Sequence, residues 1–267
     1  MADWRPMLNR RNGGIPRIMG VLNLTPDSFH ADSRVASLEE AVRRASDMVR
    51  NGAELIDVGG ESTRPGAAPV DPSEEVRRAI PVVEAIRSAL PSACISIDTR
   101  RAGVARAALD AGADMVNDVS ALSDPEMVDV VSEHGCPVCI MHMQGLPESM
   151  QDDPGYGDVV AEVREVLGNA ARSLFDAGVE PEMVIADPGI GFGKSLEQNL
   201  VLLAAGREVV PDHRMALMWG VSRKTMFHHL LGREDTRERL AGTLGVAAKA
   251  VGRGVDIIRV HDVAEHA

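Results

Sequence analysis

The chain has 267 residues, of which 45% are hydrophobic and 25% are charged, and its formal net charge at pH 7 is −12. This composition is typical of a globular protein that is large enough to fold without disulfides or structural metals. The negative charge argues against a general nucleic-acid-binding surface. No apolar run approaches the roughly 18 residues of a membrane span, and residues 1–14 lack the apolar core of a signal peptide, so we expect a cytoplasmic protein without membrane or nucleic-acid partners.

Short apolar runs alternate with segments of helical periodicity along the whole chain. The eight runs begin near Ile18, Leu55, Cys94, Met115, Pro137, Met183, Met215 and Asp256. Strands separated by helices form parallel sheets with right-handed crossovers. The alternation therefore predicts a single (β/α)8 barrel, or TIM barrel, over residues 1–267, with residues 1–17 as an extension that leads into the first strand. A doubly wound open sheet is the structural alternative.

Helical spacing of apolar residues, together with caps and glycines, gives the intervening helices. They are expected over 37–51 with Ser37 as the cap, from Pro72 onward, and over 102–111, 124–135, 158–177, 195–206 and 236–251. Only residues 262–267 follow the eighth strand, and six residues make fewer than two helical turns. The eighth helix is therefore predicted to be shortened.

Polar residues end nearly every apolar run, where the active site of such a barrel lies. They are Asn23, Glu61–Arg64, Asp98, Asn117, His142, Asp187, Ser222–Lys224, and Arg259 with His261. Asp98, Asn117 and Asp187 would converge on one opening, and their oxygens favour a flat heterocycle that presents amino and ring N–H groups. Met141 is expected to line the same pocket, because thioethers pack well on aromatic rings. Structural hydrogen bonding is the alternative for each of these polar residues.

The segment DPGIGFGK, residues 187–194, fits neither the phosphate-loop pattern nor the dinucleotide-binding pattern of glycines. Asp187 is interpreted as a ligand contact or as a helix cap. Ser222 and Lys224 follow the seventh strand, and Arg259 and His261 share one face of the eighth, so both places predict an anion site. A solvated basic turn and a salt bridge are the alternatives.

Other polar groups are assigned structural roles. His142 is interpreted as orienting a loop, and the pair His228-His229 is not assigned to a metal. Cys136 and Cys139 form a single CxxC at the entrance to a strand, without the second ligand pair that a zinc site needs. We therefore expect two inert, buried thiols there.

Eight segments in order resemble the dihydropteroate synthase family of the folate pathway. They span Met19 to Val263 and read MGVLNLTPDSF, IDVGGESTRPGA, SIDTRRAGVARAAL, GADMVNDVSAL, MHMQGLPESMQ, ADPGIGFGKSLEQNL, GVSRK and GVDIIRVHDV. The resemblance implies a (β/α)8 barrel that usually forms a homodimer. It also implies an alkyl transferase that joins 6-hydroxymethyl-7,8-dihydropterin diphosphate to p-aminobenzoate, giving 7,8-dihydropteroate and pyrophosphate.

The resemblance also assigns roles to individual residues. Asp98, Asn117, Asp187 and Lys224 would bind the pterin, with Asp187 on its amino and ring N–H edge. The diphosphate would be held by Asn23, Arg64, Arg259 and His261, with Asn23 as a ligand of Mg²⁺. Thr63, Ser222 and the stem of Lys224 would frame p-aminobenzoate, whose carboxylate is expected at the start of the seventh helix. The resemblance also assigns Phe192 and Gly220 to substrate binding. It places Asp27, Phe29 and Pro65 in loops that would close to build the p-aminobenzoate pocket.

An ionising, SN1-like mechanism follows from these roles. Arg64, Arg259 and His261 would stabilise the leaving pyrophosphate, and Asp98 would stabilise the positive charge on the pterin methylene, with Lys224 also in the catalytic set. Three alternatives remain: a methyltetrahydrofolate methyltransferase, a catalytically inactive pterin-binding barrel, and a Schiff-base aldolase that uses Lys224.

Two features depart from the family pattern. The first loop reads SFHADSR where the family more often has SFSDGG, so we expect a stiffer loop with altered p-aminobenzoate or sulfonamide affinity. The second is the short eighth helix. The family's dimer interface uses helices on that side of the barrel, so this departure affects the predicted homodimer.

Overall fold

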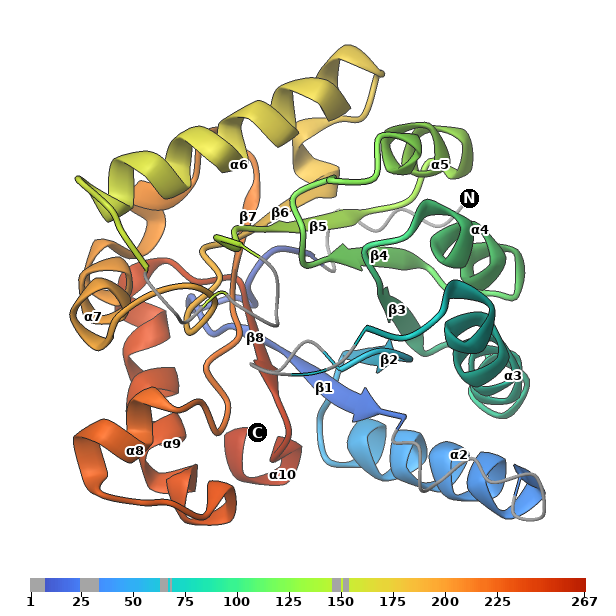
Figure 1. Cartoon of the computed structure of the whole chain (residues 1–267). Helices are drawn as coiled ribbons and strands as arrows, with labels where there is room; N and C mark the ends of the chain where they lie inside the picture. Colours follow the sequence, from blue (N-terminus) through green and yellow to red (C-terminus); the bar gives the residue numbers. More distant parts are fainter. Residues whose placement is uncertain (1–7, 25–33, 63–66, 68, 146–149, 151–153) are drawn as a thin grey trace.

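The structure is a computed structural model that describes residues 8–24, 34–62, 67, 69–145, 150 and 154–267. Within these residues, eight parallel strands form one closed barrel in sequence order. Figure 1 shows the strands at the centre of the molecule, with the helices arranged around them. The strands are β1 (Arg17–Asn23), β2 (Leu55–Gly59), β3 (Cys94–Asp98), β4 (Met115–Asp118), β5 (Val138–Met141), β6 (Val184–Asp187), β7 (Ala216–Trp219) and β8 (Ile257–Val260).

Helices follow the strands around the barrel. The α-helices in the described part of the chain are α2 (Arg34–Arg50), α3 (Pro72–Ala89), α4 (Ala102–Asp110), α5 (Glu126–His134), α6 (Val159–Asp176), α7 (Leu196–Ala205), α8 (Met226–Leu231), α9 (Leu240–Ala250) and α10 (Val263–His266). Short 3₁₀ helices are η3 (Pro181–Met183), η4 (Gly206–Val209), η5 (Thr236–Arg239) and η6 (Val251–Arg253). After β8 the chain forms only α10, as the predicted short eighth helix.

The first strand closes the barrel by pairing on both sides. Met19 of β1 lies opposite Leu55 of β2 and also opposite Arg259 of β8, in parallel register. A sheet whose first and last strands pair has no free edge. The predicted (β/α)8 barrel is therefore confirmed, and the doubly wound open sheet is excluded.

The barrel interior changes from apolar to polar along the strands. An apolar layer near the strand starts consists of Leu8, Met19, Leu55, Cys94, Met115, Cys139, Ile185, Ala216, Met218 and Ile257. Because side chains of a strand alternate between its two faces, residues two positions further along also point inward. These include Asp57 on β2, Asn117 on β4, Asp187 on β6 and Arg259 on β8. A polar layer therefore follows the apolar layer toward the strand ends.

Local sequence signals explain where two of the flanking helices begin. Asp71 caps α3 by accepting a hydrogen bond from the backbone N–H of Ser73, and Pro72 occupies the first helical position. Ser195 and Gln198 form a reciprocal capping box at the start of α7. The box fixes the point at which the glycine-rich segment 187–194 ends and the helix begins.

Two predicted helices differ from the structure. Helix α2 begins at Arg34, so Ser37 lies within the helix and is not its cap. The apolar pair Val35 and Leu38 continues the helical spacing upstream of the predicted start. The predicted helix over 236–251 begins as the 3₁₀ turn η5, where Asp235 accepts from the backbone N–H of Arg237, and α8 precedes it after β7.

The cysteines are free and buried. Burial raises the pKa of the Cys94 and Cys136 thiols to about 12, and raises the pKa of Cys139 well above its usual value. The thiolate is the reactive form, so these thiols are unreactive near neutral pH, as predicted for the CxxC pair. Among the described residues, no helix is both long enough and apolar enough to cross a membrane.

Candidate active site

The strand ends bring buried carboxylates and an amide together inside the barrel mouth. Asp98, Asn117 and Asp187 end or nearly end β3, β4 and β6, and their exposed fractions are 5%, 2% and 4%. Met141, at the end of β5, lies opposite Asp187 in the strand register and is also buried. The sequence prediction placed these four residues around one opening, and the barrel register does so.

Arg259 occupies the centre of this polar layer. Its Nε donates to Asp57 Oδ2 at 2.6 Å, and its Nη2 donates to Asp98 Oδ2 at 2.6 Å. Asn117 Nδ2 donates to the same oxygen of Asp57 at 3.0 Å. The sequence predicts a ligand that presents donors to Asp98, Asn117 and Asp187. The structure adds that Arg259 donates to one of these carboxylates, Asp98, and to Asp57, which the sequence prediction does not include.

The pKa values of the pair reflect burial and mutual attraction. Burial raises the pKa of Asp98 to about 7, with Arg259 acting in the opposite direction and Asp57 adding to the rise. The carboxylates of Asp57 and Asp98 raise the pKa of Arg259 against its own desolvation, so the guanidinium stays charged. Asp98 is therefore a carboxylate whose ionisation near neutral pH depends on Arg259.

Asp187 and Lys224 form a second charged group on the opposite side of the mouth. Asp187 Oδ1 accepts from the backbone N–H of Gly189 at 2.7 Å. Its other oxygen would lie 3.6 Å from a methyl group placed on Gly220, so the glycine leaves open space beside Asp187 Oδ2. Burial raises the pKa of Asp187, while Lys224 acts to lower it. Burial lowers the pKa of Lys224 to about 7, and Asp187 partly offsets that decrease.

Lys224 reaches this position by passing over the glycine-rich segment. Its Nζ donates to the backbone carbonyl of Ile190 and lies 3.9 Å from the centroid of the Phe192 ring. A methyl group on Gly191 would approach Lys224 Cδ to 2.9 Å, so a side chain there would displace the lysine. The segment thus provides both a hydrogen-bond acceptor and an aromatic face for the ammonium.

Ser222 and His261 join the ends of β7 and β8. Ser222 Oγ accepts from the backbone N–H of His261 at 3.1 Å and lies 3.0 Å from His261 Nδ1. Arg223, between Ser222 and Lys224, pairs with Asp262 through two hydrogen bonds. The Ser222–His261 contact connects the two strand ends where the anion site is predicted. Both arginines there are in salt bridges, Arg223 with Asp262 and Arg259 with Asp57 and Asp98.

Asn23 ends β1 beside Asp98. A methyl group on Gly59 would lie 3.7 Å from Asn23 Oδ1 and 3.7 Å from Asp98 Oδ2, so both side chains flank this glycine. The described residues contain no group of three or more His, Cys, Asp or Glu side chains that would hold a metal. Asn23 would hold Mg²⁺ through its amide oxygen, a ligand type that suits this ion, beside waters and substrate phosphates.

Five predicted residues lie outside the described part of the chain: Asp27, Phe29, Thr63, Arg64 and Pro65. The structure does describe both sides of the second loop. Glu61 Oε1 accepts from the backbone N–H of Val70 at 2.8 Å, and Arg101 donates to both Glu61 and the carbonyl of Val70. The base of that loop is thus held by charged side chains, with Glu75 as a further buried partner of Arg101.

The sequence interpretation missed two buried charged residues. Asp57 is fully buried within the apolar run LIDVG, and its alternation with Leu55 and Gly59 was the available signal for an inward-pointing carboxylate. Lys194 is 3% exposed and ends the glycine-rich segment, where Asp187 and Phe192 had been assigned roles. The failed match to the phosphate-loop pattern had left this lysine without an interpretation.

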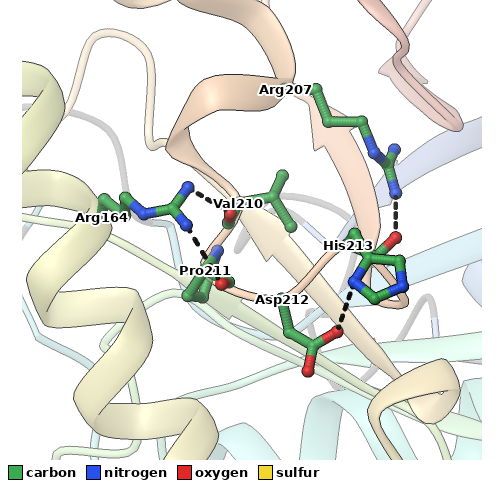
Figure 2. A pocket seen from close by; sticks show the side chains of 6 residues that line it. All are labelled: Arg164, Arg207, Val210, Pro211, Asp212 and His213. Carbon is green, nitrogen blue, oxygen red and sulfur yellow. Dashed lines mark hydrogen bonds and ion pairs between the residues drawn. The ribbon is translucent and has the colours of Figure 1, made fainter.

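A cavity of about 430 Å³ lies at the other end of the barrel (Figure 2). It is lined by Arg164, Arg207, Val210, Pro211, Asp212 and His213, which lead into the start of β7. Both arginines are bound to backbone carbonyls, and Arg207 also pairs with the buried Asp256 at 2.5 Å. In barrels of this type, residues at the strand starts serve stability, so we do not place the active site here.

Comparison with known proteins agrees with the geometry. The family model for pterin binding enzymes matches residues 19–261. A dihydropteroate synthase of Escherichia coli strain K12 is 46% identical over 250 residues, which cover 94% of this chain and 88% of the relative. A Xanthomonas albilineans dihydropteroate synthase with 4-aminobenzoic acid has a TM-score of 0.86 and 41% identity, covering 94% of this chain and 89% of that one.

A Burkholderia cenocepacia dihydropteroate synthase complexed with 7,8-dihydropteroate has a TM-score of 0.84 and 44% identity. The similarity covers 94% of this chain and 88% of that one. A polar barrel mouth of this composition and a match over nearly the whole chain lead to the same result: the chain belongs to the family of pterin-binding enzymes.

Proposed function

We propose that this protein is a dihydropteroate synthase. It condenses 6-hydroxymethyl-7,8-dihydropterin diphosphate with p-aminobenzoate to give 7,8-dihydropteroate and pyrophosphate. One observation carries the proposal: the barrel mouth combines buried acceptors for a donor-rich ring, at Asp98, Asn117 and Asp187, with a cationic group for a diphosphate at Arg259. The similarity to synthases over most of the chain supports it.

The pterin is proposed to lie across the polar layer. Asp187 Oδ1 is occupied by the Gly189 N–H, so Oδ2, beside the open space at Gly220, accepts from the amino and ring N–H edge. Asn117 turns its amide nitrogen toward Asp57, which leaves its carbonyl oxygen to accept from the ring. Lys224 donates to the ring carbonyl, and Met141 packs against the ring. Each polar edge of the heterocycle thus has a partner of the opposite hydrogen-bonding type.

The diphosphate is proposed to lie at the ends of β1, β2 and β8. Arg259, His261 and Arg64 provide positive charge there, and Arg259 turns from the carboxylates toward the phosphates as they arrive. Asn23 provides an amide oxygen for Mg²⁺. Bound with the diphosphate, the ion supplies positive charge that stabilises the leaving pyrophosphate.

p-Aminobenzoate is proposed to bind between the glycine-rich segment and the end of β7. The ring of Phe192 and the stem of Lys224 are already in contact and offer an apolar surface to its ring. Ser222 offers a hydroxyl to the carboxylate, and Thr63, with the loop residues Asp27, Phe29 and Pro65, completes the pocket. The altered first loop, HADSR, is the part of this pocket most different from the family pattern.

The reaction is proposed to begin with ionisation of the pterin substrate. The bond between the exocyclic methylene carbon and the diphosphate oxygen breaks, and its electron pair leaves with pyrophosphate. The methylene carbon becomes cationic, and the ring nitrogens and the Asp98 carboxylate stabilise it. The amine nitrogen of p-aminobenzoate then forms the new C–N bond and gives up one proton.

This order predicts that pyrophosphate is released in a single turnover even without p-aminobenzoate. The measurement is rapid quenching of enzyme in excess over the pterin diphosphate with Mg²⁺, followed by quantification of pyrophosphate. An ionising mechanism predicts measurable cleavage of the pterin diphosphate in the absence of p-aminobenzoate. Complete dependence of cleavage on p-aminobenzoate would instead show that the amine attacks while the diphosphate leaves.

A steady-state assay separates the proposed function from its alternatives. A synthase releases pyrophosphate continuously when both substrates and Mg²⁺ are present. A methyltetrahydrofolate methyltransferase would consume the methylated folate and release no pyrophosphate, and a catalytically inactive barrel would bind a pterin without turnover. A Schiff-base enzyme would be trapped on Lys224 by borohydride. The expected result is pyrophosphate release without consumption of methylated folate and without borohydride trapping on Lys224.

We also propose that the enzyme is a cytoplasmic homodimer. The support for a dimer is a set of exposed apolar side chains on neighbouring elements, namely Leu200 and Val201 of α7, Leu230 and Leu231 of α8, and Val251 of η6. The free cysteines agree with a reducing compartment. Sedimentation equilibrium, which measures the mass of the assembly, distinguishes the dimer from a monomer.

A further inference from the structure

Lys194 carries a buried amino group that the proposed reaction does not use, and burial lowers its pKa to about 7. Its Nζ lies 2.9 Å from His142 Nδ1, 3.0 Å from the carbonyl oxygen of Gly189, 2.9 Å from that of Phe192 and 3.3 Å from that of His142. A buried ammonium is costly unless acceptors surround it, and its three N–H groups are all satisfied by this set. The chain has three lysines, and two of them, Lys194 and Lys224, follow barrel strands β6 and β7. Three of the four acceptors around Lys194 are backbone carbonyls.

The acceptor on His142 has a defined protonation state. Burial, together with repulsion by Lys194, lowers the pKa of His142 to about 3, so its ring is neutral. Nδ1 therefore carries no proton and accepts from the lysine, which puts the ring proton on Nε2. Lys194, His142 and the carbonyl groups of Gly189 and Phe192 form a unit that we name the lysine clasp.

The clasp joins the loop after β5 to the loop after β6 at van der Waals distance. Gly189 and Gly193 have φ of 66° and 61°. A Cβ on Gly189 would overlap the carbonyl oxygen of His142, and one on Gly193 would lie 2.6 Å from the carbonyl oxygen of Gln144. Tyr156 Oη also donates to the carbonyl of Gly193 at 2.8 Å. The two loops therefore have one close-packed arrangement, and the ammonium is the only group of the clasp that attracts both backbones.

The segment that the clasp fixes is the one that Lys224 contacts. Between the two clasped carbonyls lies Ile190, whose own carbonyl accepts from Lys224, and Phe192 carries the ring beneath the same ammonium. Asn199 holds the segment from the side of α7 by accepting from the backbone N–H of Gly191 at 2.7 Å. A shift of this segment would move the acceptor and the aromatic face together, while Asp98 and Asn117, on β3 and β4, would keep their places. Asp187 is bonded to the segment through the Gly189 N–H.

We propose that Lys194 is a positioning residue for the second substrate: its buried ammonium holds the 189–192 backbone against the 142–144 backbone, and so fixes Phe192 and the Ile190 carbonyl against Lys224. The kinetic consequences rest on the proposed synthase function. Because Asp98 and Asn117 hold the pterin from strands outside the segment, loss of the clasp acts more on p-aminobenzoate, which uses Phe192 and the stem of Lys224, than on the pterin.

The test replaces Lys194 with methionine, which has a similar length but neither charge nor donor. Lys194→Met is expected to raise KM for p-aminobenzoate by about tenfold or more, the change expected from loss of a charged hydrogen bond. The affinity for the pterin alone, measured by calorimetry, is expected to change by less than about threefold. Lys249→Met, on the exposed face of α9, is the matched control and leaves both quantities unchanged.

Variants at His142 test whether the two residues act as a unit. His142→Asn keeps an acceptor near the position of Nδ1, whereas His142→Leu removes it. We expect a larger rise in KM for p-aminobenzoate with leucine than with asparagine, and the double variant H142L/K194M to be no worse than Lys194→Met. If Lys194→Met does not fold, the two His142 variants still test whether the contact between Lys194 and His142 positions the segment.

Two outcomes overturn the proposal. One is equal loss of pterin affinity and p-aminobenzoate affinity in Lys194→Met, which would show general disruption of the barrel mouth. The other is additive effects in the double variant, with His142→Leu and His142→Asn indistinguishable. Absence of turnover in the unmodified protein would instead reject the synthase function, so the two failures are distinguishable.

Discussion

Replacing Arg259 with methionine is expected to lower kcat/KM for the pterin diphosphate by a factor on the order of 10³. Two losses combine in this variant. The diphosphate loses a charged ligand, and the carboxylates of Asp57 and Asp98 lose the guanidinium that donates to both of them at 2.6 Å. Removing one partner of a buried ion pair is costly because the remaining charge has no compensation. Initial rates at varied concentrations of the pterin diphosphate give the ratio directly.

The Arg259→Met variant is also expected to change the pH dependence of kcat/KM. The pKa of Asp98 is raised by burial to about 7, and Arg259 acts to lower it. If the ionised carboxylate is required, kcat/KM falls as the pH drops below the pKa of the free enzyme. Removing Arg259 raises that pKa further, so the acid limb moves to higher pH. Lys224, whose pKa burial lowers to about 7 with Arg259 acting in the same direction, is expected to govern the alkaline limb, so removing Arg259 moves that limb to higher pH as well.

Arg207→Met is the matched control for this prediction. Arg207 also pairs with a buried aspartate, Asp256, but at the opposite end of the barrel. We expect a loss of thermal stability with little change in kcat/KM measured below the unfolding transition. An unchanged acid limb in Arg259→Met, or equal kinetic losses in the two variants, would contradict the role assigned to Arg259.

Asp187→Asn is expected to weaken pterin binding by a factor on the order of a thousand. The carboxylate has one oxygen on the Gly189 N–H and the other free beside Gly220. In asparagine, the carbonyl oxygen keeps the bond to Gly189, which turns the NH₂ group toward the ring edge. A donor then faces the amino and N–H donors of the pterin. Isothermal calorimetry with a pterin that lacks the diphosphate measures the effect without catalysis.

Asp118→Asn makes the same chemical change at a neighbouring strand end. Asp118 is also fully buried, but its oxygens accept from Ser120 and from the backbone N–H of Leu122. We expect this variant to lose stability and to keep its pterin affinity. Equal pterin affinity in Asp187→Asn and in the unmodified protein would remove Asp187 from the binding pocket.

The barrel itself was predictable from the sequence, because its signals are local. Each strand is a short apolar run, and polar residues follow it at the position where a parallel strand must end. The predicted starts at Pro137, Met183, Met215 and Asp256 differ from the observed starts by one residue. Helix ends were less certain, as Ser37 shows, since a residue that caps well can also lie inside a helix.

The contacts within the site were not predictable in the same way. Arg259 and Asp57 are 202 positions apart, and only the closed register of β1 between β2 and β8 brings them together. The sequence resemblance assigned Arg259 to the diphosphate, but it did not indicate that the guanidinium would rest on two carboxylates. Asp57 was read as part of an apolar run, although the alternation of inward positions already pointed it into the barrel.

Lys194 is a further residue whose contacts could not be predicted from the sequence. Its neighbours in sequence are glycines and a capping serine, which suggest a flexible turn. Two of its four partners, Nδ1 and the carbonyl of His142, come from the preceding loop, 52 positions earlier, and three of the four are backbone carbonyls that every sequence provides. A buried lysine of this kind is visible only when the backbone of both loops is known.

The central claim, that this barrel mouth transfers a pterin methylene group from diphosphate to an aromatic amine, is tested most directly by product stoichiometry. The purified protein is incubated with 6-hydroxymethyl-7,8-dihydropterin diphosphate, p-aminobenzoate and Mg²⁺, and both products are quantified over many turnovers. We predict that 7,8-dihydropteroate and pyrophosphate form in equal amounts. Absence of dihydropteroate, with the pterin substrate bound but unchanged, would contradict the account.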